Sequence, residues 1–79
     1  MKVTVKYFAL FKDLTGKIQE SMEIKKGKTT NDLLGIIMKK YKLKDNVNIV
    51  MALNQEYIKT DALLNDGDEV AIMMPSSGG

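Results

Sequence analysis

The sequence TTNDLLGIIMKKY at residues 29–41 decides the fold, because it predicts one amphipathic helix. Thr29 is a favourable N-cap, and Asp32 three residues later completes the pattern of a capping box. The acidic side chain also suits the positive end of the helix dipole. Apolar side chains recur at helical spacing along one stripe, at Leu33, Leu34, Ile37 and Tyr41. A single helix of this kind can cover only one face of a sheet.

The rest of the chain consists of short segments with the pattern of strands. In residues 2–7 every second side chain is apolar, which is typical of a half-buried strand. A short helical turn is expected within residues 8–14, ended by Gly16. The other strands are expected at residues 19–24, 48–53, 57–59 and 69–73. The element order is therefore strand, short helix, strand, main helix, and then three strands.

This order predicts an α+β fold of the ubiquitin-like β-grasp kind. One main helix would pack on one face of a mixed sheet of about five strands. The first and last strands are the candidates for a central parallel pair. Residues 1–74 are expected to form this domain and residues 75–79 a flexible C-terminal tail. The reason is that Pro75 cannot donate to a sheet ladder, and the residues after it have no apolar anchor.

The composition excludes several classes of function. The chain has 79 residues, enough for one domain, and it contains neither Cys nor His. Disulfides, cysteine or histidine catalysis and the usual zinc sites are therefore excluded. The net charge of +2 does not argue for nucleic-acid binding. The apolar runs are far shorter than the roughly 20 residues that span a membrane, and no signal-peptide core is present, so a cytoplasmic location is expected.

Three stretches carry a resemblance to a known family. The first runs from Tyr7-Phe8-Ala9 to Gly16, and the second is Met51-Ala52-Leu53-Asn54. The third is Leu64-Asn65-Asp66-Gly67-Asp68-Glu69-Val70-Ala71, followed by Pro75-Ser76-Ser77-Gly78-Gly79. At matching spacing over the whole chain, they resemble the small subunits of molybdopterin synthase, which are ubiquitin-like sulfur carriers. The departures from the family pattern are Lys12, Asp13, Met74 and Ser76.

The resemblance implies a function centred on the carboxylate of Gly79. A ubiquitin-activating-like adenylyltransferase would use ATP to adenylate this glycine, and a sulfur donor would convert the adenylate to a thiocarboxylate. The tail would then insert into the large synthase subunit, where the sulfur builds the dithiolene of molybdopterin. The inserting residues besides Gly79 are Pro75, Ser76, Ser77 and Gly78. On this interpretation the chain is a non-catalytic subunit that binds no cofactor, because the activating enzyme holds the ATP.

The resemblance also implies apolar contacts with the partner proteins. Phe8, Leu64 and Met73 correspond to positions that dock the partners, and each has a competing interpretation as a core residue. Met74 either serves the same contact or fills the edge of the core. An exposed methionine suits a surface that serves two partners, because its side chain adapts to different shapes.

Other functions stay open at this point. A ubiquitin-like protein modifier would join Gly79 to lysines through an isopeptide bond, and a thiamine-pathway sulfur carrier would use the same thiocarboxylate. An adaptor without tail chemistry is the remaining alternative. The Asp66-Gly67-Asp68 stretch is interpreted as a turn and not as a metal site, because a calcium loop needs more oxygen ligands at regular spacing.

Overall fold

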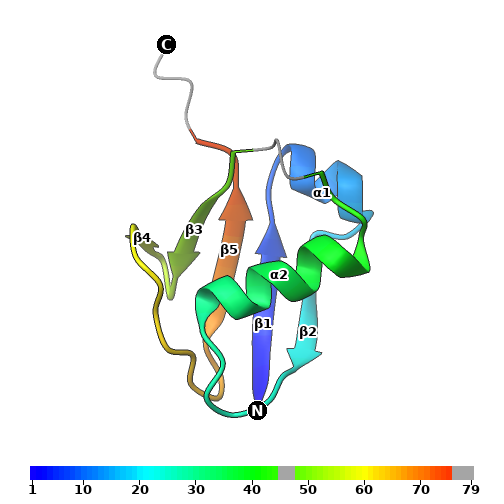
Figure 1. The fold of residues 1–79 in the computed structure, drawn as a ribbon. Helices are drawn as coiled ribbons and strands as arrows, with labels where there is room; N and C mark the ends of the chain where they lie inside the picture. Colours follow the sequence, from blue (N-terminus) through cyan, green and yellow to red (C-terminus); the bar gives the residue numbers. More distant parts are fainter. Residues whose placement is uncertain (45–47, 76–79) are drawn as a thin grey trace.

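A mixed sheet of five strands lies against one main helix (Figure 1). The computed structural model describes residues 1–44 and 48–75. Its strands are β1 (Lys2–Tyr7), β2 (Gln19–Glu23), β3 (Val50–Leu53), β4 (Glu56–Ile58) and β5 (Glu69–Met73), and its helices are α1 (Leu10–Thr15) and α2 (Thr30–Lys40). The strand order β2-β1-β5-β3-β4 confirms the predicted ubiquitin-like β-grasp fold.

Strands β1 and β5 form the parallel pair at the centre of the sheet, as predicted. Val5 lies opposite Val70 and Tyr7 opposite Ile72, and all four side chains are buried. The other pairs are antiparallel: β2 joins β1, and β3 lies between β5 and β4. Because the two central strands are parallel, both end at the same edge of the sheet, the upper edge in Figure 1.

The core lies between the sheet and α2. Side chains alternate along β1, so that every second one points toward the helix. Leu33 and Ile37 of α2 are fully buried against them, and Phe11 of α1 is fully buried as well. The other two positions of the predicted apolar stripe, Leu34 and Tyr41, are partly buried and pack against this core. The predicted stripe is therefore the face that α2 turns to the sheet.

The N-terminus of α2 is held by the predicted capping box and by a further carboxylate. Thr29 Oγ1 accepts a hydrogen bond from the Asp32 N–H, and Asp32 Oδ2 accepts one from the Thr29 N–H at 2.9 Å. Asp61 accepts hydrogen bonds from the Asn31 N–H and the Thr30 hydroxyl. The bond from Asn31 is the main reason that the pKa of Asp61 lies below its usual range. The two carboxylates satisfy donors that the first turn of a helix leaves without partners.

Strand β3 begins at Val50, two residues later than the sequence pattern predicts. Val50 is paired with Met73, and Met73 is the last residue of β5. The residues just before Val50 therefore pass the end of the neighbouring strand. Strand β5 itself ends shortly before Pro75, as predicted, because proline has no N–H to donate.

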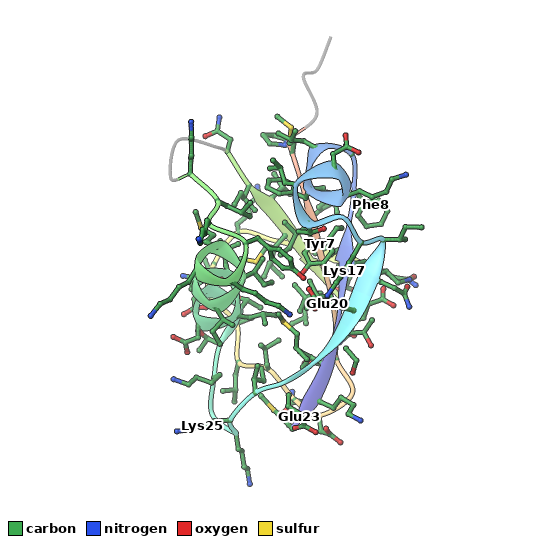
Figure 2. All side chains as sticks on the ribbon, turned by 90° about the vertical axis from the view of Figure 1, so that its right-hand side faces the viewer. Tyr7, Phe8, Lys17, Glu20, Glu23 and Lys25 are labelled. Carbon is green, nitrogen blue, oxygen red and sulfur yellow. The ribbon has the colours of Figure 1, made fainter. Side chains whose placement is uncertain are left out.

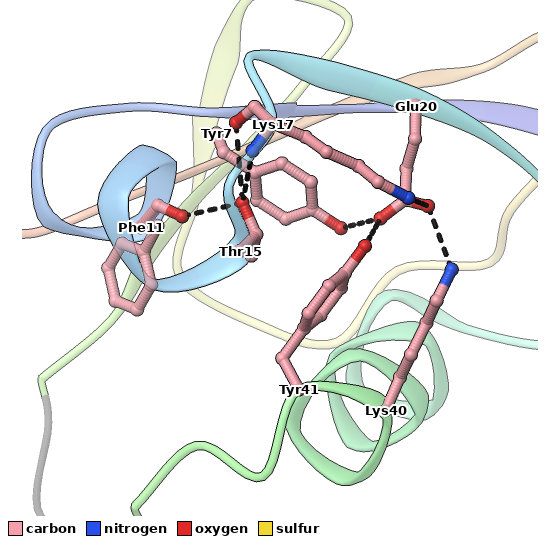
Figure 3. A network of polar contacts seen from close by, with 7 residues as sticks. All are labelled: Tyr7, Phe11, Thr15, Lys17, Glu20, Lys40 and Tyr41. Carbon is pink, nitrogen blue, oxygen red and sulfur yellow. Dashed lines mark hydrogen bonds and ion pairs between the residues drawn. The ribbon is translucent and has the colours of Figure 1, made fainter.

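The carboxylate of Glu20 joins α2 to the edge of the sheet (Figure 3). Its side chain is 9% exposed and lies on the face of β2 that points toward the core. The hydroxyls of Tyr7 and Tyr41 donate to Oε2, and the Nζ atoms of Lys40 and Lys17 lie 2.9 and 3.2 Å from Oε1. We call these five residues the Glu20 cluster. Burial alone raises the pKa of Glu20, but the four donors outweigh it and lower the pKa to about 2.

Replacing Gly35 by alanine is expected to stabilise the protein. Gly35 lies on the exposed side of α2, and a Cβ added there meets no atom within 4 Å. Because alanine has the higher helix propensity, Gly35→Ala should raise the free energy of unfolding by about 1 kcal/mol. Urea unfolding followed by circular dichroism measures the change. Gly16→Ala is the matched control: Gly16 caps α1 at φ 73°, so a methyl group should destabilise there, and stabilisation at both positions would contradict the argument.

The Glu20 cluster predicts a loss of stability in acid. The pKa of Glu20 is about 2 in the folded protein, against 4.5 for an unperturbed glutamate. Its contribution is therefore complete above about pH 4.5 and is lost as the pH falls toward 2. At neutral pH the contribution is on the order of 2–3 kcal/mol.

Urea unfolding at a series of pH values tests this prediction. Glu20→Gln should lower the free energy of unfolding near pH 7 and have a much smaller effect near pH 2. Glu23→Gln is the matched control, because the exposed carboxylate of Glu23 lies on the same strand without these donors. A difference between wild type and Glu20→Gln that stays constant across this range would overturn the assignment.

Candidate functional site

The face of the sheet opposite α2 carries an uncovered apolar patch. It consists of Phe8, which follows β1, together with Ala52 of β3, Tyr57 of β4, and Ala71 and Met73 of β5. Ala52 is paired with both Ala71 and Tyr57, so these three side chains share one face. Figure 2 shows Phe8 on the side away from α2, whereas Tyr7 points toward the helix. We call these five residues the open-face patch.

The open-face patch is a shallow hollow with methyl groups at its base. Ala52 and Ala71 are buried there, whereas Phe8 is 46% exposed and Tyr57 is 73% exposed. The hollow has a volume of about 290 Å³. A continuous apolar surface is one of the features that mark protein interaction sites. The shape and chemistry are therefore suited to receive apolar side chains from another protein.

An ion pair borders the open-face patch. Lys6 Nζ lies 3.2 Å from Glu69 Oε1, across the central pair of strands, and both side chains are about one-third exposed. An ion pair as exposed as this adds little to stability. At the rim of an apolar surface, however, the two opposite charges can orient a partner that approaches the patch.

The backbone after β1 turns sharply and leaves Phe8 on the open face. The Phe8 N–H donates to the Ile72 carbonyl at 3.1 Å, and the Phe8 carbonyl accepts from the Phe11 N–H at 3.0 Å. Ala9 lies inside this turn with φ 50° and ψ −122°. These angles are those of the first central residue of a type II′ turn, a position that favours glycine. An alanine held there costs on the order of 1–3 kcal/mol.

The structure places Leu64 in the core, which is one of the two interpretations that the sequence left open, and not at the surface. Its side chain is only 2% exposed. The Leu64 N–H donates to the Lys28 carbonyl at 3.0 Å, and Leu63 forms a bridge with Thr29. These contacts with the segment before α2 turn Leu64 inward and leave Leu63 59% exposed. Two adjacent leucines in the sequence do not indicate which of them points inward.

The other expected contact residues lie at or near the surface. Met73 is half-buried in the open-face patch, and Met74 is 43% exposed just beyond β5. Pro75 is exposed and is the last residue that the structure describes. The tail residues Ser76, Ser77, Gly78 and Gly79 lie outside the described residues, and their roles stay predictions.

Tyr57 is a candidate contact that the sequence pattern does not reveal. Its short strand gives too few residues to show which side chains face the core. The register of the hairpin decides the question, because Tyr57 is paired with Ala52 on the open face. The only signal in the sequence is an aromatic residue at the start of the short strand expected at residues 57–59.

The structure offers no grouping for metal coordination in residues 1–44 and 48–75: no three His, Cys, Asp or Glu side chains there are placed to hold an ion. Within the same residues, no helix has the length and apolar character needed to cross a membrane.

Comparison with known proteins agrees with this geometry. Residues 5–79 match the model of the ThiS family. The chain belongs to this family. The resemblance to molybdopterin synthase small subunits is also confirmed, because homologues of this ThiS-family chain are molybdopterin synthase sulfur carrier subunits.

The relatives cover the whole chain. The molybdopterin synthase sulfur carrier subunit of Chlamydomonas reinhardtii is 41% identical over 83 residues, covering 100% of both proteins. That of Mycobacterium tuberculosis is 33% identical over 82 residues, covering 100% of this chain and 99% of the relative.

Solved structures share the fold of this ThiS-family chain. Molybdopterin converting factor subunit 1 from Pyrococcus furiosus has a TM-score of 0.87 at 35% identity, covering 96% of this chain and 99% of the other. A Helicobacter pylori complex of subunits 1 and 2 of molybdopterin-converting factor has a TM-score of 0.72 at 26% identity, with 100% of both chains covered. Small archaeal modifier protein 1 from Methanosarcina acetivorans has a TM-score of 0.78 at 26% identity, covering 99% and 96%.

The different placements of Leu64 and Phe8 can be tested by truncation. Leu64→Ala removes a buried side chain and should lower the free energy of unfolding by about 2–5 kcal/mol. Phe8→Ala should change it by less than about 1 kcal/mol, because Phe8 is half exposed. Chemical denaturation measures both variants, with Leu63→Ala as the exposed neighbour of Leu64. If Leu64→Ala were no more destabilising than Leu63→Ala, the core placement of Leu64 would be wrong.

Proposed function

We propose that this chain is the sulfur carrier subunit of a molybdopterin synthase. The observation that carries the proposal is the similarity to such subunits over the whole chain. The apolar open-face patch supports it, because Met73 joins the patch to the strand that leads into the tail. The proposed place of action is the cytoplasm.

The proposed reactive group is the carboxylate of Gly79. A carboxylate resists nucleophilic attack, so a ubiquitin-activating-like adenylyltransferase first joins it to AMP from ATP and releases pyrophosphate. A donor then supplies sulfur at the oxidation level of sulfide, which attacks the carbonyl carbon; AMP leaves with the electron pair of the broken C–O bond, the S–H proton goes to solvent, and the product is a thiocarboxylate. In this scheme the activating enzyme binds the ATP, and the carrier itself binds no cofactor.

The composition of the tail suits transfer between two enclosed active sites. Residues 75–79 span at most about 17 Å when fully extended. Gly78 and Gly79 have no side chains to clash with a narrow channel, and the reacting carbon is unhindered. Pro75 restricts the backbone at the start of the tail, which lowers the entropy lost on insertion.

The open-face patch is the proposed docking surface for the large subunit. The Helicobacter pylori relative is a complex of subunits 1 and 2, which supports a two-subunit assembly for this chain. Aromatic residues at the centre of an interface commonly contribute most of its binding energy, and Phe8 and Tyr57 are exposed in the patch. Met73 adds a side chain that can adapt to the activating enzyme as a second partner.

A second candidate function is that of a ubiquitin-like protein modifier. The observation that favours it is the similarity to small archaeal modifier protein 1 from Methanosarcina acetivorans. In this case a lysine amine attacks the adenylated Gly79 and AMP leaves, which forms an isopeptide bond. The two functions share the activation step and differ only in the nucleophile that follows it.

Intact-mass spectrometry tests the sulfur-carrier proposal. We expect the mass gained by exchange of one oxygen for sulfur at Gly79 when the chain is co-expressed with a ubiquitin-activating-like enzyme and a sulfur source. A chain lacking Gly79 should show no exchange, whereas Gly35→Ala should behave like the wild type. Absence of exchange in the intact chain would refute the proposal. Lysines of other proteins that carry residues 60–79 of this chain after trypsin digestion, without such exchange, would favour the modifier function instead, because Lys59 is the last basic residue before Gly79.

A further inference from the structure

Ala9 has a backbone conformation that its side chain disfavours. With φ 50° and ψ −122°, it occupies a region where the Cβ atom of an L-residue is crowded and where glycine is usual. The turn around it is closed by backbone groups alone, through the hydrogen bond from the Phe11 N–H to the Phe8 carbonyl. A glycine at this position could make the same turn without the steric conflict.

The folded domain makes little use of the Ala9 methyl group. Ala9 is exposed and lies outside the hydrophobic core that the described residues form. It precedes α1, and it provides no side-chain hydrogen bond to cap that helix. The buried anchor of this segment is Phe11. A strained residue whose side chain does not serve packing or capping is expected to serve a function.

Ala9 is the chain neighbour of Phe8 in the open-face patch. Ala9 directly follows Phe8, and the Phe8 N–H is bonded to the Ile72 carbonyl near the end of β5. From that end the chain continues through Met74 and Pro75, both exposed, toward the tail. Figure 1 shows the start of α1 and the end of β5 at the same edge of the molecule. A protein that receives the tail and covers Phe8 therefore comes close to Ala9.

We propose that the Ala9 methyl group is a contact in the surface that docks the large subunit. This inference rests on the proposed function, because it takes the partner to be the large subunit with an apolar surface facing Phe8. The strain at Ala9 is retained because the methyl group gains contacts in the complex that the free carrier lacks. Ala9 thereby lowers the stability of the free chain while it strengthens association.

The test is Ala9→Gly, measured in two assays. Relief of strain should raise the melting temperature by about 2–6 °C, even after the greater freedom of glycine in the unfolded chain is included. Affinity for the purified large subunit from the same organism should fall by about three- to fivefold, as expected for one buried methyl group. The loss should appear mainly as faster dissociation, measured by biolayer interferometry on the full-length chain.

Two controls make the test specific. Gly35→Ala raises stability on the exposed side of α2 and should leave affinity unchanged, which separates stability from binding. Chemical synthesis with D-alanine at position 9 relieves the strain and keeps the turn rigid, but it moves the methyl group to the other side of the Cα atom. This chain should bind as weakly as Ala9→Gly. Recovery of wild-type affinity by D-alanine would mean that rigidity matters and would overturn the contact.

The Phe8→Ala variant shows whether a negative result refutes only the contact at Ala9 or the proposed docking surface as well. If Phe8→Ala weakens binding of the large subunit but Ala9→Gly does not, the contact at Ala9 is refuted and the docking surface stands. If neither variant weakens binding, the docking surface itself is wrong, and the inference fails with it. A lower melting temperature for Ala9→Gly would show that the turn prefers alanine, which would remove the premise.

Discussion

The parallel pairing of β1 with β5 is the constraint on which the rest of the structure depends. It joins the two ends of the domain in the middle of the sheet, where Val5 and Tyr7 are buried beside Val70 and Ile72. Since parallel strands end at the same edge, the residues after β1 and the residues after β5 become neighbours. This is why Phe8, which follows the first strand, lies beside Met73, which ends the last. The positions of the proposed docking surface and of the start of the tail thus follow from strand direction.

The two faces of the sheet differ in how far their apolar side chains are buried. On one face, α2 buries the apolar side chains, and Lys40 and Tyr41 at the end of that helix donate to Glu20 of the edge strand β2. On the other face, Ala52 and Ala71 keep the surface shallow while Phe8 and Tyr57 remain exposed. A domain of this size buries only about 60% of its unfolded surface, so it can complete one core and leave the opposite face partly exposed. The strain that we assign to Ala9 lies at the border of that uncovered face.

Most of the fold could be predicted from local patterns, because their causes are local. Alternation in residues 2–7 gave the bounds of β1, the Thr29–Asp32 pattern gave the start of α2, and Pro75 indicated where β5 must stop. The site was less predictable. Phe8 and Met73 lie at the surface, in agreement with one of their two interpretations, whereas Leu64 lies in the core. The sequence could not show this for Leu64, because two adjacent leucines have no periodicity that indicates which of them is buried. The roles of residues 76–79 remain predictions.

The sequence by itself determined the elements, their order and the family, since helix caps, alternation, turn residues and motif spacing act over a few residues. Only the tertiary structure decided which side chains meet. Tyr57 joins the open-face patch because of the register between β3 and β4. Asp61 reaches the N-terminus of α2, and Glu20 collects donors from the segment before β2, from β1 and from the end of α2. These contacts depend on how distant segments align, and alignment is set by burial of the whole core, not by any short stretch of sequence.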